Sequence, residues 1–205
     1  MVAVPTSERV HSAALALFAT RGFEGTGIRQ IAHDAGITVA SLYHYVGTKE
    51  DLLERMMQQS MTALLEPARR LTATQADPAR RLSGLVDLHV RRHAAESQIC
   101  LVGDTEIRSL SPASRARVIA LRDEYQDIWA RTLADGVTAG EFAVPDVPLA
   151  AKALLQMCTG VAHWYRPEGR LSLDELSRSF VEMAGALTRG AHHDGAGRDT
   201  ALAAG

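Results

Sequence analysis

The sequence predicts an all-α protein of about nine helices, with a small three-helix head followed by a larger helical body. Apolar residues recur at helical spacing along nearly the whole chain, and no segment alternates as a strand would. Hydrophobic residues make up 46% of the 205 residues and aromatic residues only 5%, which favours packed helices rich in Ala and Leu. Two short apolar helices around a glycine, near residue 36, predict a helix-turn-helix in the head.

Three short helices are expected within the first fifty residues. The first begins after Thr6 or Ser7, since either hydroxyl can cap it. The second and third cover about 28–35 and 39–45, and Gly36 allows the tight turn that sets them across each other.

A long fourth helix is expected to connect the head to the body without a flexible linker. Thr48 and Asp51 have the spacing of a capping box at its start, and Pro67 is expected to bend or interrupt it. Caps and proline positions predict five further helices, the last two covering about 148–165 and 172–189. The three preceding helices begin near residues 78, 98 and 112.

The chain therefore divides into a head of residues 1–50, a body of residues 51–190 and a tail of residues 191–205. The tail is small and polar, so we expect it to be disordered. No basic leader precedes an apolar run at the start, and no apolar run approaches the length of a membrane span. We expect a cytoplasmic protein with no membrane partner, in which Cys100 and Cys158 are reduced core thiols.

The charge balance excludes a general polybasic surface. The formal net charge is -2, and acidic and basic residues also balance within the first fifty residues. Any binding of nucleic acid must therefore come from local geometry.

The third helix has two chemically different faces. Leu42 and Val46 point toward the two preceding helices, whereas Ala40, Ser41 and His44 face the opposite side. The small side chains of Ala40 and Ser41 allow the helix to sit deep in a major groove, where a methyl and a hydroxyl can contact base edges.

Other side chains around this helix have the length or position to hold the DNA backbone. Tyr43, His44 and Lys49 are long enough to reach flanking phosphates. Three residues lie at or near helix starts, where side chains and backbone N–H groups can hold phosphate: Thr26, Arg29 and Thr38. An ordinary three-helix packing unit would show the same two faces, so that alternative stays open from the residue pattern alone.

Five short motifs follow one another between residues 21 and 53. They are Gly22-Phe23, Ile31-Ala32, Ala35-Gly36-Ile37, Leu42-Tyr43-His44-Tyr45 and Lys49-Glu50-Asp51-Leu52-Leu53. Together they resemble the N-terminal DNA-binding domain of the TetR family of bacterial transcriptional regulators. Two positions depart from the family pattern: Gly27 stands where many members carry a Ser or Thr cap, and Val46 replaces a common Phe.

The resemblance implies a homodimer in which each subunit has a DNA-binding head and a body with a ligand pocket and the dimer face. The partner is then a palindromic operator in double-stranded DNA. The DNA-contact positions of the family fall here on Arg29, Val39, Ala40, Ser41, Tyr43, His44, Tyr45 and Lys49.

The body resembles one branch of the same family. The resemblance is carried by residues 122–129, 136–142 and 156–176, and in that branch several members respond to acyl-CoA thioesters of fatty-acid or steroid breakdown. Apolar and basic side chains of the body are compatible with a long cavity for such an effector, although the same residues would also serve as core and solvated surface. The candidate ligand-binding residues are Met61, Leu64, Leu85, His89, Arg92, Leu121, Arg122, Tyr125, Trp129 and Met157.

The last two expected helices, 148–165 and 172–189, are the expected dimer face. Small residues would let them approach a second subunit closely in an isologous four-helix contact. These residues are Gly160, Ala184, Gly185 and Ala186.

The sequence thus predicts a ligand-responsive repressor of catabolic genes that a small apolar or acyl-CoA effector releases from DNA, with the fourth helix as the lever. One alternative is a TetR-type regulator of drug efflux or other metabolism with a different ligand. A helical small-molecule binder without DNA binding and an enzyme built on a helical bundle are further alternatives.

Nothing in the sequence supports catalysis or a cofactor. No Ser/His/Asp constellation and no phosphate loop is present, so we expect no enzyme and no cofactor. His89 and His93 are four residues apart and could meet one metal ion. Two histidines on an apolar helix face more often line a core or a pocket, so we expect no metal.

Overall fold

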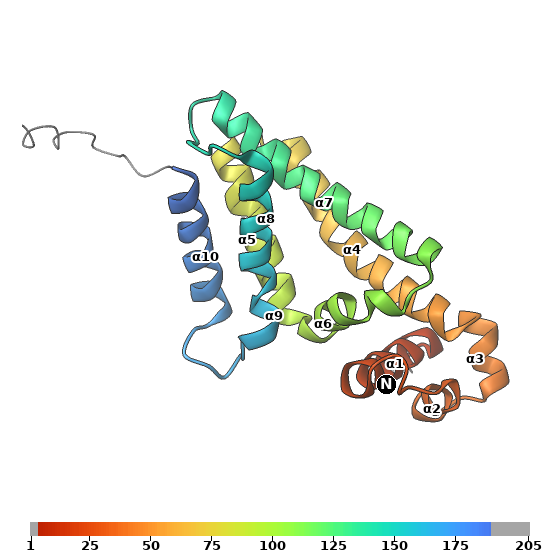
Figure 1. Ribbon diagram of the computed structural model, residues 1–205. Helices are drawn as coiled ribbons and strands as arrows, with labels where there is room; N and C mark the ends of the chain where they lie inside the picture. The colour runs from red at the N-terminus through yellow and green to blue at the C-terminus, as the bar shows by residue number, and fades with distance from the viewer. Residues whose placement is uncertain (1–3, 190–205) are drawn as a thin grey trace, which may run out of the picture.

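The computed structural model describes residues 4–189, and all regular secondary structure in this range is helical (Figure 1). The elements are α1 (Thr6–Arg21), α2 (Ile28–Asp34), α3 (Val39–Val46), α4 (Lys49–Thr74), α5 (Pro78–Ala95), α6 (Ser97–Glu106), the 3₁₀ turn η1 (Ile107–Ser109), α7 (Pro112–Thr138), α8 (Val147–Thr159), α9 (Val161–Trp164) and α10 (Leu173–Thr188). The all-α class is confirmed. The expected tail, residues 191–205, lies outside the described residues.

The first helix begins earlier than predicted. It includes Thr6, and no side-chain hydrogen bond caps it, so neither Thr6 nor Ser7 acts as the cap. Pro5 takes this position instead, because its carbonyl accepts from the backbone N–H groups of Glu8 and Arg9 at 3.1 Å each. Gly22, with φ of 70°, ends the helix in a conformation that residues with a side chain rarely adopt.

Local capping fixes the starts of the longer helices. Thr48 and Asp51 form the predicted capping box of α4, and Ser172 and Glu175 form that of α10. Pro67 does not interrupt the helix, because α4 continues through it to Thr74. Buried apolar residues before and after this proline pack α4 against α5 and α7, which holds the helix together across it.

Two expected helices are divided in the structure. The helix expected at 148–165 becomes α8 and α9 on either side of Gly160. The helix expected at 98–109 tightens into η1 at its end, so α6 is only ten residues long. This short α6 lies between the body and the head (Figure 1).

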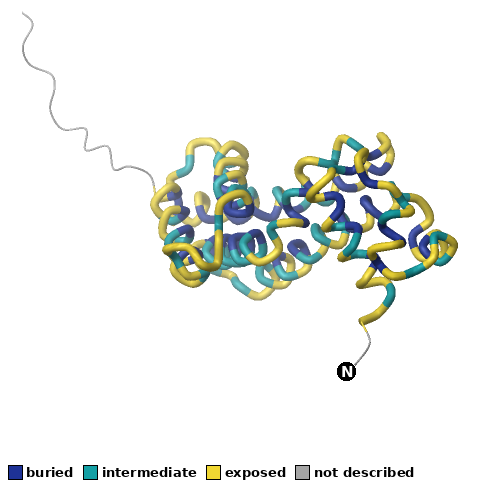
Figure 2. Tube along the Cα trace, turned by 90° about the horizontal axis from the view of Figure 1, so that it is seen from below, coloured by how far each residue is buried: buried dark blue, intermediate teal, exposed yellow. Residues whose placement is uncertain are grey.

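The described residues form two apolar cores. The first joins α1, α2 and α3 to the start of α4 and to α6. The second lies among α4, α5, α7, α8 and α10. Figure 2 shows buried chain in both halves, and α4 passes from one to the other. Because α6 packs into the core of the head, the body contacts the head through α6 as well as through α4.

Within residues 4–189, we find no helix that combines the length and hydropathy needed to cross a membrane.

Candidate nucleic-acid interface and effector cavity

Helix α3 presents the two faces that its sequence predicts. Leu42 and Val46 are 0% and 3% exposed and belong to the core of the head. On the other side Ala40 and His44 are exposed, and Ser41 is half-buried. The anchoring residues thus hold α3 on the head while a row of small and polar side chains faces outward.

Two tyrosines flank this outward row. Tyr43 is 51% exposed and Tyr45 is 46% exposed, values that are high for large aromatic side chains. Each can place a hydroxyl beside a nucleic-acid backbone while its ring covers the surface. Arg55 fixes this end of the helix, since its guanidinium donates to the carbonyl of Tyr45 at 3.0 Å. Sequence reasoning missed Arg55, whose side chain reaches back ten residues.

The start of α3 is held by its own side chains. The hydroxyl of Thr38 accepts from the backbone N–H of Ser41 at 3.1 Å, and the two hydroxyl oxygens lie 2.9 Å apart. Thr38 and Arg29 are exposed, and Val39 is half-buried and packs on the head core. The N-terminus of α3 is therefore ordered before any partner binds it.

Thr26 corrects the sequence-based prediction of a phosphate contact. Its side chain is only 2% exposed, and its hydroxyl donates to the carbonyl of Gly22 at 2.8 Å. The hydroxyl therefore closes the turn between α1 and α2 and does not face outward.

Lys49 also differs from the prediction, because its ammonium group is engaged inside the head. Nζ donates to the carbonyl of Phe23 at 2.7 Å and to that of Thr26 at 2.9 Å. It also lies 4.0 Å from the centre of the Phe23 ring. Two of its three donors are thus used on the α1–α2 loop, so this lysine holds the loop against the start of α4.

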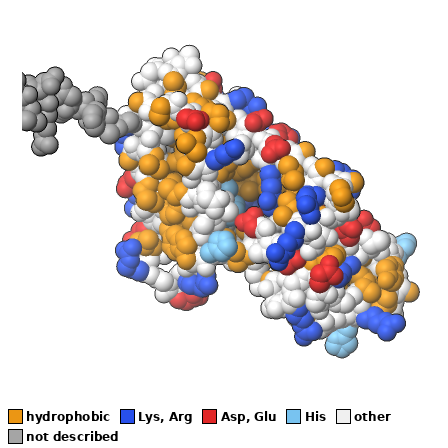
Figure 3. All heavy atoms as spheres, viewed as in Figure 1, with side chains coloured by type: hydrophobic (Ala, Val, Ile, Leu, Met, Phe, Trp, Pro, Cys, Tyr) orange, Lys and Arg blue, Asp and Glu red, His pale blue; other side chains and the backbone are white. Residues whose placement is uncertain are grey.

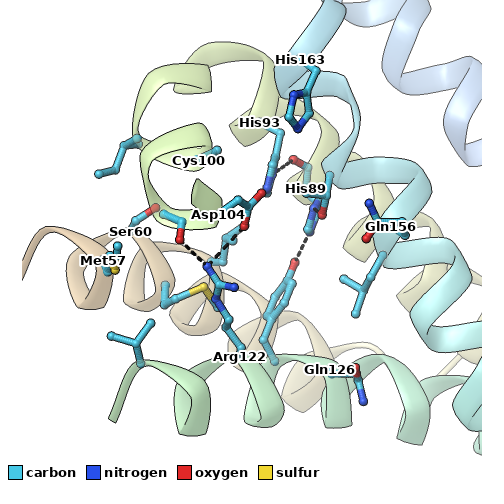
Figure 4. Close-up of a pocket in the computed structure, with 18 residues that line it drawn as sticks. Met57, Ser60, His89, His93, Cys100, Asp104, Arg122, Gln126, Gln156 and His163 are labelled. Atoms are coloured by element: carbon cyan, nitrogen blue, oxygen red, sulfur yellow. Dashed lines mark hydrogen bonds and ion pairs between the residues drawn. The ribbon is translucent and has the colours of Figure 1, made fainter. Parts of the chain in front are cut away.

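A cavity of about 490 Å³ opens in the body among α4, α5, α6, α7, α8 and α9 (Figure 4). This volume lies in the range of cavities that hold one small molecule. Of the ten candidate ligand-binding residues, the structure places five on its wall: Met61, Leu64, His89, Arg122 and Tyr125.

The other five candidates do not line the cavity. Leu85 and Trp129 are each 0% exposed and fill the core of the body. Leu121 and Met157 are half-buried and pack against that core. Arg92 is turned to its own helix, where it pairs with Glu96 at 2.6 Å. These five side chains share helices with cavity residues, but they lie on sides of those helices that face away from the cavity.

Sequence reasoning missed the wall that α6 contributes. It consists of Ile99, Cys100, Gly103 and Asp104. A Cβ built on Gly103 would meet only the Arg122 guanidinium within 4 Å, at 3.8 Å, so this glycine leaves open space in the cavity. The apolar pattern of α6 is too short to show which side faces a cavity and which side faces the head.

Two histidines of α5, His89 and His93, form a buried polar part of the wall. Their rings stack with centroids 3.9 Å apart. Nδ1 of His89 lies 3.3 Å from the Tyr125 hydroxyl, and its Nε2 lies 3.1 Å from the Thr159 hydroxyl. Burial, followed by the neighbouring His93, holds the pKa of His89 well below its usual value, so the ring is neutral.

The rim of the cavity is polar and more exposed. Arg122 donates to the carbonyl of Gly103 at 2.9 Å and lies 3.3 Å from the Asp104 carboxylate. Gln156 and His163 are exposed at the same rim (Figure 4). The cavity therefore has an apolar interior with a neutral polar wall and a charged entrance.

An apolar surface lies over the last helices of the body, where hydrophobic side chains gather (Figure 3). Its large exposed members are Leu149, Trp164, Met183 and Leu187. Leu149 and Leu187 are each 63% exposed. Of the small residues expected on this surface, Ala184 is instead 1% exposed and faces the core, because α10 turns this position toward α5.

A helix-turn-helix head with an exposed third helix, joined to a helical body with a cavity, defines a class of two-part helical DNA-binding protein. Comparison with known proteins identifies the family. The model of the family described as "Bacterial regulatory proteins, tetR family" matches residues 11–56. The model described as "Tetracyclin repressor-like, C-terminal domain" matches residues 75–188. The chain belongs to the TetR family and is a transcriptional regulator, not an enzyme.

Relatives cover nearly the whole chain. The HTH-type transcriptional repressor KstR2 of Rhodococcus jostii is 28% identical over 83% of this chain and 84% of the relative. The structure of the TetR family regulator PfmR of Thermus thermophilus matches with a TM-score of 0.80 and 30% identity, over 90% of this chain and 100% of that one. The structure of AibR in complex with isovaleryl coenzyme A and operator DNA matches with a TM-score of 0.79 and 25% identity, over 87% of this chain and 97% of that one.

Proposed function

We propose that this chain is a homodimeric repressor that binds a palindromic operator and leaves it when a small effector enters the cavity. Residues 1–50 form the DNA-binding head, and residues 51–190 hold the effector and the second subunit. One observation carries this proposal: Ile99 and Cys100 of α6 line the cavity and at the same time belong to the apolar core of the head.

The shared helix gives occupancy of the cavity a physical route to the DNA-binding surface. An effector that displaces the cavity side of α6 also displaces its other side, which packs on α1. Helix α4 is displaced together with α6, because its first turns belong to the same core. To weaken DNA binding a hundredfold, the effector must prefer the non-binding form by about 2.7 kcal/mol.

The outward row of α3 is the proposed base-reading surface. Ala40, Ser41 and His44 face the major groove, and Val39 contacts the groove from the start of the helix. Four exposed side chains hold the phosphates on either side: Arg29, Thr38, Tyr43 and Tyr45. Phosphate contacts fix the register of the head, and the short side chains of Ala40 and Ser41 permit close approach to the bases.

The proposed effector class is an acyl-CoA thioester. The interior of the cavity suits an acyl group, and its volume of about 490 Å³ leaves the coenzyme A portion at the rim. There Arg122 uses only one guanidinium nitrogen in the contacts described, so its other N–H groups can bind carbonyl or phosphate oxygens. The likeness to AibR, whose structure contains isovaleryl coenzyme A, supports the same class. Control of catabolic genes in the cytoplasm is part of this proposal.

The apolar surface over α8, α9 and α10 is the proposed dimer face. Leu149, Trp164, Met183 and Leu187 would be buried there against the same surface of a second subunit. Such a contact fixes the distance between two α3 helices and thus the spacing of the operator half-sites.

Fluorescence anisotropy with a labelled fragment of the region upstream of its own gene tests the function. We expect tight binding that isovaleryl-CoA or decanoyl-CoA weakens at least tenfold, while free coenzyme A leaves it unchanged. Binding that neither thioester alters would refute the effector class. A protein that binds this fragment no better than a shuffled sequence would refute the operator assignment.

A further inference from the structure

One nitrogen on the inner wall of the cavity has a defined chemical role. Nδ1 of His93 lies 3.0 Å from the carbonyl oxygen of His89, one helical turn earlier (Figure 4). A carbonyl oxygen can only accept, so Nδ1 must carry the proton and donate it. The position of the proton on the ring is thereby fixed by the backbone of α5.

The ring of His93 is also neutral. Burial lowers its pKa, and Arg92 acts in the same direction, whereas the bond to His89 and the nearby Asp104 oppose this without reversing it. A neutral ring with its proton on Nδ1 leaves a lone pair on Nε2. Nε2 is therefore a hydrogen-bond acceptor and cannot donate.

This acceptor is open to the cavity. Within the described part of the chain, Nε2 of His93 has no hydrogen-bond partner, yet it is not among the fully enclosed unpartnered atoms. The side chain is only 6% exposed and lines the cavity, so the space that reaches Nε2 is that of the cavity itself. The neighbouring His89 does not compete for a ligand, since both its nitrogens have partners.

We infer that Nε2 of His93 accepts a hydrogen bond from a hydroxyl group on the apolar part of the effector. The cavity then selects a hydroxylated acyl group over the unsubstituted group and over the ketone. A ketone oxygen can only accept, so it would face the lone pair of Nε2 without a proton between them. This inference rests on the proposed function, because it assumes that the cavity holds the effector.

The position of His93 favours the acyl group as the source of the donor. An amide N–H of the coenzyme A arm is the other source of a donor in the same molecule. His93 is only 6% exposed and stacks on the buried His89, whereas Gln156 and His163 are exposed at the rim; the exposed Asp104 lies near His93. The coenzyme A arm occupies the rim, so the group that reaches His93 belongs to the acyl part.

Calorimetric titration with three matched thioesters tests the selection: decanoyl-CoA, 3-hydroxydecanoyl-CoA and 3-oxodecanoyl-CoA. We expect the hydroxylated thioester to bind about tenfold more tightly than the other two, the worth of one buried hydrogen bond. Equal affinities for all three would overturn the inference.

Two variants separate the acceptor from the packing of the ring. His93→Asn keeps a donor near the position of Nδ1 and removes the acceptor at Nε2, so we expect it to lose the preference for the hydroxylated thioester. His93→Gln places an amide oxygen near the position of Nε2 and should retain much of that preference. A His93→Asn variant that weakens all three thioesters equally would assign the donor to the coenzyme A arm and refute the hydroxyl.

A measurement without any thioester keeps this inference separate from the effector class. Nitrogen-15 NMR of the histidine rings at neutral pH should show His93 protonated at Nδ1 alone. Addition of 1-decanol should shift the Nε2 resonance, and decyl methyl ether, which lacks a donor, should not. A proton on Nε2, or no response to decanol, would overturn the inference. Failure of all three thioesters to bind, with the decanol response present, would refute only the acyl-CoA proposal.

Discussion

Replacement of Lys49 by methionine tests whether this residue holds the head together or holds DNA. The variant keeps the length of the side chain and removes the ammonium group. In the structure that group makes hydrogen bonds of 2.7 and 2.9 Å to two backbone carbonyls and lies 4.0 Å from the centre of the Phe23 ring. Since the side chain is half-buried, we assign about 1 kcal/mol to each bond and less to the ring contact, about 2 kcal/mol in all.

Thermal unfolding and salt-dependent DNA binding measure the two roles separately. A loss of about 2 kcal/mol lowers Tm by roughly 4–8 °C in a chain of this size. Removal of a phosphate contact instead reduces the slope of log K against log salt by about 0.9. For Lys49→Met we expect the lower Tm and an unchanged slope.

Arg29→Met is the matched control, because Arg29 is exposed and lies on the proposed DNA-binding face. It should leave Tm unchanged and reduce the slope by about 0.9. If Lys49→Met keeps the wild-type Tm and reduces the slope as Arg29→Met does, the internal role derived from the structure is wrong.

Three further predictions follow from the site and the surface. Ser41→Ala should narrow the difference in affinity between operator and shuffled DNA, whereas Tyr43→Ala should weaken binding to both DNAs equally. Competition binding measures the two effects, and equal losses of affinity for both DNAs with Ser41→Ala would show that Ser41 does not read bases. The pKa of His89 is lower in the folded chain than in the unfolded chain, so acid adds protons to the unfolded state first and stability falls below about pH 6.5. Urea unfolding should show that the free energy of unfolding falls by about 1 kcal/mol between about pH 7.5 and 5.5, and His89→Gln should reduce this fall. An identical fall in that variant would exclude His89 as its source. Leu187→Glu should yield a folded monomer by light scattering, because this side chain is 63% exposed within the subunit; a dimer that persists would contradict the proposed face.

Local patterns allowed much of the head to be predicted from the sequence. The two faces of α3 follow from helical periodicity, since Leu42 and Val46 are one turn apart and need a common apolar surface. The capping box at Thr48 is equally local, because its hydrogen bonds span only three residues. Lys49 could not be assigned in this way, since its acceptors lie 23 and 26 residues earlier in the chain.

The position and lining of the cavity could not be predicted, because they depend on contacts between helices that the sequence does not specify. Trp129 and Tyr125 are four residues apart on α7, yet the first fills the core and the second also reaches the cavity. Helical periodicity predicts that both point inward, but it does not show where the packing leaves space. The wall from α6 was missed for the same reason, because Cys100 contributes both to the head core and to the cavity.

Replacement of Gly103 by leucine tests most directly the claim that cavity occupancy releases the head from DNA. Its Cβ would point into open space beside Arg122, so a leucine there would occupy the part of the cavity next to Arg122, whereas Gly103→Ala adds only one methyl group and serves as the control. In the anisotropy assay, decanoyl-CoA should weaken operator binding at least tenfold for wild-type and Gly103→Ala. Gly103→Leu should no longer respond to the thioester. A Gly103→Leu variant that still binds the operator and is still released by decanoyl-CoA as readily as wild-type would contradict the account.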